Sequence, residues 1–365
     1  MHVGWRWKPF VVVSFLILLS SPPLVGAGSP ATQPAPRIVE LRGTAAELGR
    51  QHGEALGDSI RLLQDRYMKA YMQTDAQRVL ARSVANMFEA RLMPEHRDEI
   101  KALAAAAKID EPDEMLANCF LDLSPMTACS TVTLPADAAP DHIGRFGRNL
   151  DFMSFGVADK QSVVLIYHPT DRYAFAAVTW PGIIGCLSGM NEHGLTLANM
   201  EVTRPQRAPL AMPYVMLYRT VLERCRRVDE AVDLLRKTPR QTANNLMLMD
   251  AAGNRAVVEI QPQGISVRRG EDHAALISTN HQRGQDQDTP GRCDRYDALH
   301  DLSQRSFGKI DEKRIESMLA RVSQADFTMQ SMVFEPSTRV LYLSCGADAV
   351  HGTFTKIDLA QYFRH

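Results

Sequence analysis

The sequence predicts an α+β fold in which antiparallel sheets are covered by helices. Three observations support this: helical patterns come first, strand patterns follow in two batches, and further helices separate and follow those batches. Helices and strands that segregate in this way favour layered α+β packing over a doubly wound sheet. The 365 residues allow one large domain or two small ones, and 45% apolar residues can supply a sizeable core.

The first 27 residues have the pattern of a secretory signal peptide. Arg6 and Lys8 precede a nearly continuous apolar run at 10–19, and small residues at 25–27 suit a signal peptidase. The run is shorter than the roughly 20 residues that span a bilayer, which disfavours a membrane anchor. Residues 28–36 are expected to form a flexible leader, and the mature protein is expected to be secreted or periplasmic without stable membrane insertion.

Residues 37–128 are predicted to be mainly helical after one short strand at 37–42. Thr44 has a side chain suited to the N-cap of the first helix. Further helices are expected at 75–92, 98–108 and 113–121. Amphipathic faces of this kind are packing faces, and no chemistry is assigned to them.

From Cys129 onward, β-branched runs alternate with Gly, Pro, Asn and Asp, which is typical of strands and turns. The first batch of predicted strands covers 130–134, 162–168, 174–179, 183–190 and 195–200, and the second covers 246–250, 256–260, 265–268 and 275–279. Helices are predicted at 213–226, 229–236, 292–302 and 312–321, and a last hairpin joins 331–335 to 340–344.

Several function classes are excluded by composition and missing motifs. The formal net charge is -1, and no basic run with interleaved aromatic residues suggests nucleic acid as a partner. The chain has no HExxH, P-loop or GxSxG motif, and its scattered histidines predict neither a metal site nor a cofactor. The six cysteines are widely spaced without a CxxC pair, which disfavours a small disulfide framework or a zinc ribbon. Nucleophilic cysteine chemistry is the remaining candidate.

Cys129 stands where the helical part ends and the first strand of the β-rich part begins. Small residues flank it, so a substrate or the preceding peptide carbonyl can approach the thiol closely. If 147–151 ends the neighbouring strand, Arg148 and Asp151 can reach Cys129. An adjacent arginine stabilises a thiolate, and a carboxylate can orient an amine. The residues alone leave a second interpretation open, a buried cysteine beside a surface ion pair.

Five stretches, in order over most of the mature chain, carry a resemblance to a known family. They are Leu41-Arg42-Gly43-Thr44 with Gly49-Arg50-Gln51-His52-Gly53-Glu54, Ala128-Cys129-Ser130, Gly147-Arg148-Asn149-Leu150-Asp151, Trp180-Pro181-Gly182 followed by Gly189-Met190-Asn191-Glu192-His193-Gly194-Leu195, and Ser278-Thr279-Asn280-His281. The chain resembles the acyl-CoA:6-aminopenicillanate acyltransferase-like family of cysteine N-terminal-nucleophile (Ntn) hydrolases. That family is related to the choloylglycine hydrolases, penicillin V acylases and acid ceramidase.

The resemblance implies an αββα sandwich and a self-catalysed cut between Ala128 and Cys129. Residues 37–128 would become a smaller helical subunit and 129–365 a larger Ntn-hydrolase core, and the two fragments would stay associated. The family often has Gly before and Thr after the cysteine, whereas this chain has Ala128 and Ser130. Processing is expected, with its efficiency left open by this departure.

The resemblance also implies roles for individual residues. Cys129 would be the nucleophile, its freed α-amine the general base, and a thioester the acyl-enzyme. Arg148 would favour the thiolate, Asp151 would position the α-amine, and Asn280 would donate to the oxyanion. Weaker candidates for oxyanion or substrate contacts are Asn191 and Asn199, and Arg292 or Arg295 matches a later family arginine.

The expected activity is hydrolysis of a small-molecule N-acyl amide, because an exported protein has little access to acyl-CoA. Acyl transfer to an amine is the competing outcome, and Trp180 is expected to pack in the core or to wall an acyl pocket. Two alternatives differ in class. A papain-type hydrolase would keep an intact chain and pair Cys129 with His281 or His193, and an exported binding protein of the same fold would use no chemistry.

Overall fold

The computed structural model describes residues 35–123, 128–202, 210–284 and 293–364. The predicted signal peptide, most of the leader and Arg292 lie outside these ranges. Within them, no helix combines the length and apolar character needed to cross a membrane.

The described strands form two sheets. The larger sheet has the order β1-β4-β5-β6-β7-β8-β9-β10, in which only β1 and β4 are parallel. Its strands are β1 (Arg37–Gly43), β4 (Val163–Pro169), β5 (Phe175–Thr179), β6 (Ser188–Asn191), β7 (Thr196–Glu201), β8 (Asn244–Met249), β9 (Arg255–Gln261) and β10 (Gly264–Arg269). The smaller sheet is antiparallel throughout, in the order β11-β2-β3-β12-β13-β14. Its strands are β11 (Leu276–Ser278), β2 (Ala128–Leu134), β3 (Arg145–Asp151), β12 (Thr328–Glu335), β13 (Val340–Cys345) and β14 (Thr355–Asp358).

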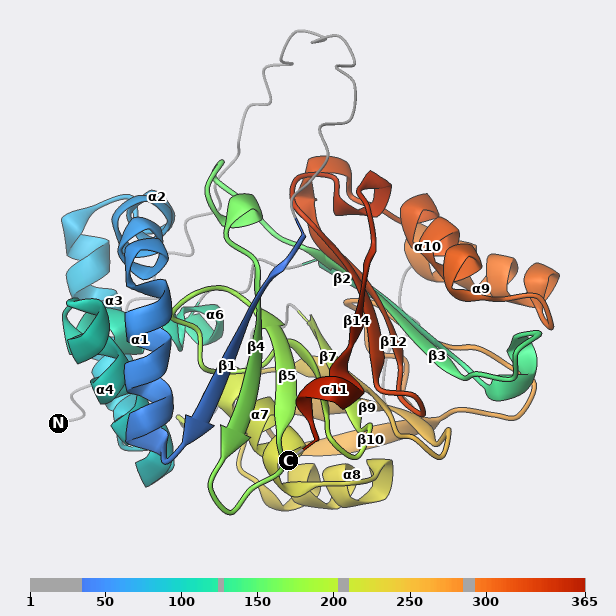
Figure 1. The fold of residues 1–365 in the computed structure, drawn as a ribbon, viewed down its shortest axis with the longest axis horizontal. Helices are drawn as coiled ribbons and strands as arrows, with labels where there is room; N and C mark the ends of the chain where they lie inside the picture. The colour runs from blue at the N-terminus through green and yellow to red at the C-terminus, as the bar shows by residue number, and fades with distance from the viewer. Residues whose placement is uncertain (1–34, 124–127, 203–209, 285–292, 365) are drawn as a thin grey trace, which may run out of the picture. The chain divides into compact units, whose positions relative to one another are not determined.

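The two sheets pack face to face between layers of helices (Figure 1). β2 of the smaller sheet contacts β7 of the larger one. Helices α9 (Asp294–Ser306) and α10 (Glu312–Arg321) pack on strands of the smaller sheet, whereas α7 (Tyr214–Arg224) and α8 (Val228–Lys237) pack on the larger sheet. The predicted α+β class and the αββα sandwich are therefore confirmed.

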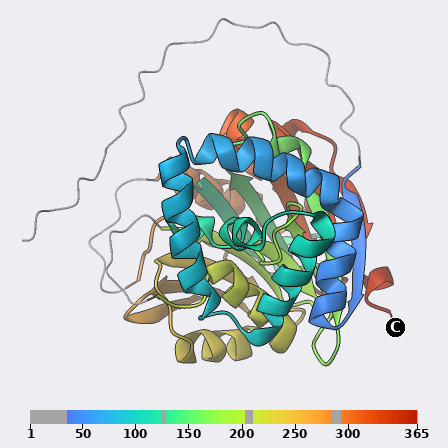
Figure 2. The ribbon, with the colours of Figure 1, turned by 90° about the vertical axis from the view of Figure 1, so that its left-hand side faces the viewer.

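Helices from the first part of the chain form a group in which α1 contacts β1 and β4 of the larger sheet (Figure 2). They are α1 (Ala45–Leu62), α2 (Lys69–Tyr71), α3 (Asp75–Glu89), α4 (Pro94–Ala107), α5 (Glu111–Ala117) and α6 (Phe120–Leu123), with a π-helical stretch at Leu63–Met68. Thr44 caps α1 as predicted, and Glu47 completes a capping box with it. A Cβ at Gly49 or Gly53 would come within 2.1 or 2.6 Å of backbone oxygens of α4, so glycine allows the close crossing of α1 and α4.

One predicted strand is only partly correct. The prediction placed a strand at 183–190, but β6 covers Ser188–Asn191. The preceding backbone pairs with α7 instead, because the Cys186 amide donates to the Val215 carbonyl at 2.9 Å. A Cβ at Gly185 would come within 2.6 Å of the Val215 side chain, so this segment lies too close to α7 for larger residues. The sequence reading also missed β14 and the π-helical stretch.

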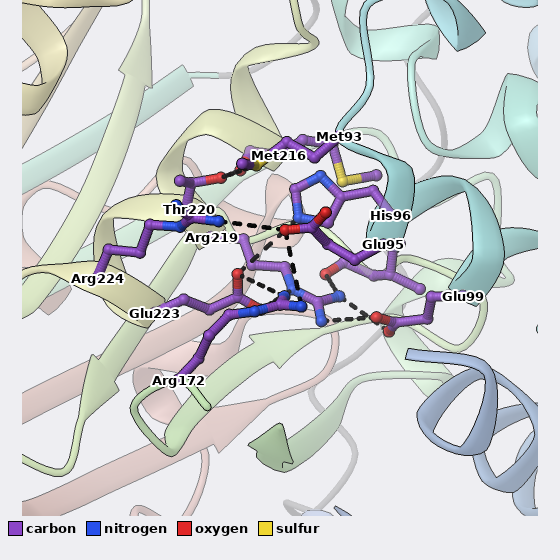
Figure 3. Close-up of polar contacts among 11 residues, drawn as sticks. Met93, Glu95, His96, Glu99, Arg172, Met216, Arg219, Thr220, Glu223 and Arg224 are labelled. Carbon is purple, nitrogen blue, oxygen red and sulfur yellow. Dashed lines mark hydrogen bonds and ion pairs between the residues drawn. The ribbon is translucent and has the colours of Figure 1, made fainter. Parts of the chain in front are cut away.

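A buried network of charges joins α4 to α7 (Figure 3). Arg219 on α7 donates to both carboxylate oxygens of Glu99 on α4, at 2.8 and 2.6 Å, and to Glu223 at 2.9 Å. All three side chains are almost completely buried. Burial works to raise the pKa of Glu223, but Arg219 and His96 hold it below its usual range. This network connects a helix that precedes Cys129 to a helix that follows it.

Candidate active site

Cys129 is the second residue of β2 and is completely buried. β2 lies between β11 and β3, so the thiol sits at one end of a central strand pair. In the register of the sheet, Cys129 faces Leu150 and Ala128 faces Asp151. Directly opposed residues of an antiparallel pair project to the same face, which places Cys129 and Leu150 on one face and Asp151 on the other.

Arg148 lies beside the sulfur on the inner face of the smaller sheet. Its Nη2 atom is 3.6 Å from Cys129 Sγ. Its Nη1 atom donates to the backbone carbonyl of Asn199 on β7, in the facing sheet. The guanidinium is fully buried, so its charge acts on the sulfur in a medium that screens it weakly. This arrangement favours a thiolate at Cys129.

Asp151 lies on the opposite face, behind the backbone that precedes Cys129. Thr328 on β12 donates to Asp151 Oδ1 at 2.5 Å, while Oδ2 has no hydrogen-bond partner among the described residues. Burial raises the pKa of Asp151 to about 6, and the Thr328 hydrogen bond, Arg295 and Arg148 oppose this rise. The sequence analysis predicted that Asp151 could reach the thiol. Because side chains alternate along β3, Asp151 instead lies on the face opposite the thiol, near the backbone that precedes Cys129.

Asn280 and Arg295 contact the backbone of Cys129. The Cys129 amide donates to Asn280 Oδ1 at 2.8 Å, and Arg295 Nη2 donates to the same oxygen at 3.0 Å. Arg295 Nη1 also bonds the Cys129 carbonyl and, at 3.0 Å, Ser130 Oγ. Asn280 Nδ2 donates to the Glu201 carbonyl at 2.8 Å, so two donors and one acceptor fix the orientation of the amide. In the uncut chain the side-chain oxygen of Asn280 therefore faces Cys129. The predicted role of Asn280 as a donor to the oxyanion would instead require its side-chain nitrogen to face the site.

The remaining predicted site residues have different positions. Asn199 contributes its carbonyl to Arg148, and its side chain donates to Asn244 at 3.4 Å. Asn191 holds the end of α7 by donating to the carbonyls of Leu222 and Cys225, at 2.8 and 2.7 Å, and its oxygen accepts from its own turn. Of the two candidate arginines, Arg295 is brought to Cys129 and Arg292 is outside the described residues. The described ranges contain no group of three or more His, Cys, Asp or Glu side chains arranged to hold a metal.

Each of the two candidate histidines contacts residues other than Cys129. His281 Nδ1 lies 3.4 Å from Thr279 Oγ1, and burial, Arg295 and Arg283 lower its pKa. His193 lies 3.7 Å from Glu192 and contacts the ring of Tyr173 edge-on. Neither of these contacts involves Cys129.

An apolar pocket lies next to the site, lined by Leu150 but not by Cys129 or Arg148. Its cavity volume is about 60 Å³. Leu150, the cross-strand neighbour of Cys129, contributes to its wall together with Phe152 and Trp180. The other wall comes from α5, α6 and the segment around Leu63–Met68. Trp180 thus lines a pocket, one of the two positions expected for it.

Sequence reasoning missed several residues that shape this site. Thr328 donates to Asp151, and the backbone carbonyl of Glu201 accepts from Asn280. The members of each pair are far apart in the sequence, so no local sequence pattern indicates these contacts. The helices before Cys129 were interpreted only as packing faces, yet they provide one wall of the pocket. The repeat of Gly49, Gly53 and Gly57 was the available indication that these helices approach their neighbours closely.

Two largely antiparallel sheets between helical layers define an αββα fold, in which a buried cysteine begins an internal strand and an arginine lies beside its sulfur. Residues 140–349, more than half of the chain, match the model of the acyl-coenzyme A:6-aminopenicillanic acid acyl-transferase family. The chain belongs to this family, and the resemblance noted in its sequence is confirmed. The matched region contains Arg148, Asp151, Asn280 and Arg295 and begins after Cys129.

Comparison with solved structures finds similar folds at low sequence identity. An N-acylethanolamine-hydrolyzing acid amidase ortholog from Caenorhabditis elegans is 17% identical, with a TM-score of 0.47 over 57% of this chain and 93% of that one. Penicillin V acylase from Agrobacterium tumefaciens is 17% identical, with a TM-score of 0.46 over 64% and 86%. A mutant of the conjugated bile acid hydrolase from Clostridium perfringens is 14% identical, with a TM-score of 0.44 over 64% and 93%. No curated protein matches the chain in sequence.

Proposed function

We propose that the chain cuts its own Ala128–Cys129 bond and then uses Cys129 to hydrolyse amide-linked acyl groups. Membership of an acyl-transferring family supports an enzyme that breaks or forms amide bonds. The observation that carries the proposal is the set of contacts on Cys129. Arg148 lies 3.6 Å from its sulfur, and Asn280 accepts from its backbone nitrogen at 2.8 Å.

The cut would begin with attack of the Cys129 thiolate on the Ala128 carbonyl carbon. The carbon–nitrogen bond then breaks, the Cys129 nitrogen takes up a proton, and the acyl group passes to sulfur as a thioester. Water hydrolyses the thioester and leaves a carboxylate at Ala128 and a free thiol and α-amine at Cys129. Asp151 faces Ala128 in the sheet and has an oxygen without a partner in the described chain, so it can accept from the new α-amine.

The freed α-amine would serve as the general base for the adjacent thiol. Its ordinary pKa of about 7.7–8.0 lets an appreciable share accept a proton near neutral pH. The thiolate attacks the carbonyl carbon of the substrate amide, and the departing amine takes a proton from the α-ammonium. Water then attacks the thioester and releases the carboxylic acid. Arg148 and Arg295 supply positive charge near the developing oxyanion.

The substrate is proposed to be a small-molecule amide with a largely apolar acyl group. The pocket beside Leu150 is lined mainly by apolar side chains, and Leu150 shares the face of the sheet that carries the thiol. The predicted signal peptide would take the mature protein to the periplasm or outside the cell. Water is the acceptor available there, and the proposal is therefore hydrolysis rather than transfer from acyl-CoA.

A panel of N-acyl amides tests the proposed reaction. Release of the amine is measured for acyl groups of increasing length, with and without an added amine acceptor. We expect faster release with apolar acyl groups that fill the pocket, and free acid as the main product. Absence of release from every member would contradict an amide-cleaving function, and dominant formation of a new amide would contradict hydrolysis.

Replacing Arg148 by lysine is expected to lower kcat/KM by about 10- to 100-fold. A charge-assisted hydrogen bond contributes roughly 1.5–3 kcal/mol, and each 1.36 kcal/mol is tenfold in rate. Lysine keeps a charge but cannot contact both Cys129 Sγ and the Asn199 carbonyl with one planar group. Thiol alkylation at a series of pH values provides a second measurement, and the variant should need a higher pH to react.

A matched control for this prediction is Arg255→Lys. Arg255 is also buried and bonds the carbonyls of Ala274 and Glu271 at 2.8 and 2.7 Å, with no contact to Cys129. Its replacement should leave the pH dependence of alkylation unchanged. If Arg148→Lys behaves in the same way as this control, Arg148 does not stabilise the thiolate.

A further inference from the structure

The pocket lined by Leu150, the cross-strand neighbour of Cys129, contains two buried polar atoms that have no hydrogen bond within the described chain. They are Oε2 of Glu114 on α5 and the hydroxyl oxygen of Tyr67 in the π-helical stretch. Glu114 is completely buried, and Tyr67 is 5% exposed. Burying a polar atom without a hydrogen bond destabilises a fold, so two such atoms in one pocket indicate a place for a bound partner.

The carboxyl of Glu114 is held in one orientation by its neighbours. Asn118 donates to Glu114 Oε1 at 3.0 Å and is itself fixed by the carbonyl of Gly182 and the amide of Ile184, each at 2.9 Å. Gly182 packs against the carboxyl, because a Cβ there would come within 3.3 Å of both oxygens. These contacts engage Oε1. Gln64 also lies near the carboxyl as a donor, but Oε2 has no hydrogen bond of normal geometry within the described chain, which leaves it available to a ligand in the pocket.

Both unpartnered groups are hydrogen-bond donors near neutral pH. Burial raises the pKa of Glu114 to about 8, with Asp113 adding to the rise and Asn118 and Gln64 opposing it. The carboxyl is therefore mainly neutral at pH 7, and its proton belongs on Oε2 because Oε1 already accepts from Asn118. The Tyr67 hydroxyl keeps its proton because burial raises its pKa far above its ordinary value. A ligand that satisfies these two groups must bring an acceptor.

The rest of the pocket restricts what that ligand can be. The ring of Tyr67 packs against Phe120 and Phe152, and Trp180 already donates its indole N–H to the Ala158 carbonyl at 2.8 Å. Apolar rings therefore pack around the ring of Tyr67, and a carboxylate ligand would have to give up its hydration in this pocket. A neutral oxygen atom on an apolar chain can accept hydrogen bonds from Glu114 and Tyr67, and the apolar chain suits the rings that line the pocket.

We propose that Glu114 and Tyr67 bind an oxygen atom of the substrate's acyl group, so that the enzyme prefers acyl chains with a hydroxyl, keto or ether oxygen over matched unsubstituted chains. This inference rests on the proposed amide hydrolysis and adds the substrate class to it. Glu114 and Tyr67 act on the acyl group rather than on the reacting carbonyl, which makes them specificity-determining residues. The helices that precede Cys129 thereby select the substrate, while the segment that begins at Cys129 cuts it.

The test compares N-acyl amides of equal chain length that carry one oxygen at successive carbons or none. For the wild-type protein we expect kcat/KM to be at least about tenfold higher for one oxygen position than for the unsubstituted chain, since one good hydrogen bond to a ligand can contribute that factor. Glu114→Leu should bring this ratio close to one. Glu114→Gln, which keeps a donor of similar shape, should retain most of it.

Tyr67→Phe is the second variant, since it removes only the hydroxyl and keeps the ring contacts. It should lower the ratio for the same oxygen position even if Glu114→Leu fails to fold. A wild-type ratio of one at every position, or an unchanged ratio in both Glu114→Leu and Tyr67→Phe, would overturn the inference while leaving amide hydrolysis intact. Failure of the wild-type protein to cleave any member of the series would instead count against the proposed function.

Discussion

Replacing Cys129 by alanine is expected to leave the chain in one piece and to reduce amide hydrolysis to the background rate. The thiol serves as nucleophile in the self-cleavage and again in every turnover, so its loss removes both reactions. Deletion of a nucleophile typically costs roughly 10⁴- to 10⁶-fold in rate. Denaturing gel electrophoresis follows the cut, and release of the amine from the best substrate follows the turnover.

Cys225→Ala is the matched control for this variant. Cys225 is another buried thiol, at the end of α7, and burial raises its pKa to about 12. Its replacement removes a sulfur of the same kind from the core without touching the contacts of Cys129, so processing and activity should persist. An uncut Cys129→Ala protein that still hydrolyses the substrate would show that another group is the nucleophile.

The second large effect is expected from Arg219→Met. Breaking a buried ion pair by removing one partner costs about 3–5 kcal/mol of stability, because the remaining charge is left without compensation. Here two carboxylates, Glu99 and Glu223, would lose their common partner (Figure 3). We expect the denaturant concentration at the midpoint of unfolding to fall by an amount that corresponds to about 3–5 kcal/mol in the free energy of unfolding.

The same variant tests how the two proposed fragments stay together. Glu99 precedes the proposed cut and Arg219 follows it, so the pair would cross between fragments in the processed protein. Processed Arg219→Met should lose its smaller fragment on gel filtration at denaturant concentrations that the wild type withstands. The uncut double variant with Cys129→Ala should show only the loss of stability, because a covalent bond still joins the parts.

Arg224→Met provides the control for this second effect. Arg224 also pairs α7 with α4, through Glu95 at 3.2 Å, but its side chain is 45% exposed. Exposed ion pairs contribute about 1 kcal/mol or less, so this variant should unfold and elute nearly as the wild type does. Equal behaviour of Arg219→Met and Arg224→Met would contradict a role for the buried network in holding the fragments.

Local patterns allowed much of the fold to be predicted. Thr44 was placed at the start of α1 because its side chain can satisfy the free amides of a first turn, and the structure shows the capping box. The helices and most strands of the β-rich part follow from apolar periodicity, which depends only on residues close in sequence. The αββα arrangement came from the family resemblance, because periodicity does not determine which sheet faces which.

What the sequence could not provide depends on register and on distant pairs. Asp151 was expected near the thiol, but the pairing of β2 with β3 turns it to the opposite face from Cys129. Arg219 and Glu99 are 120 positions apart, and no spacing rule connects them. The contact of Arg295 with Cys129 likewise depends on the position of α9 against β2.

The polar atoms in the pocket were missed for the same reason. Glu114 and Tyr67 belong to helical stretches that looked like ordinary packing elements. A buried carboxyl beside an apolar cavity becomes visible only when the surrounding helices and Gly182 are placed around it. Sequence patterns thus pointed to the residues that are proposed to react, whereas the residues proposed to select the substrate required the structure.

Mass spectrometry of the mature, folded and active protein tests the central claim most directly. We expect two chains, the second of which begins at Cys129 with a free α-amine, because the proposed mechanism takes its general base from that amine. Fully active protein in which the peptide bond between Ala128 and Cys129 is intact would contradict this account.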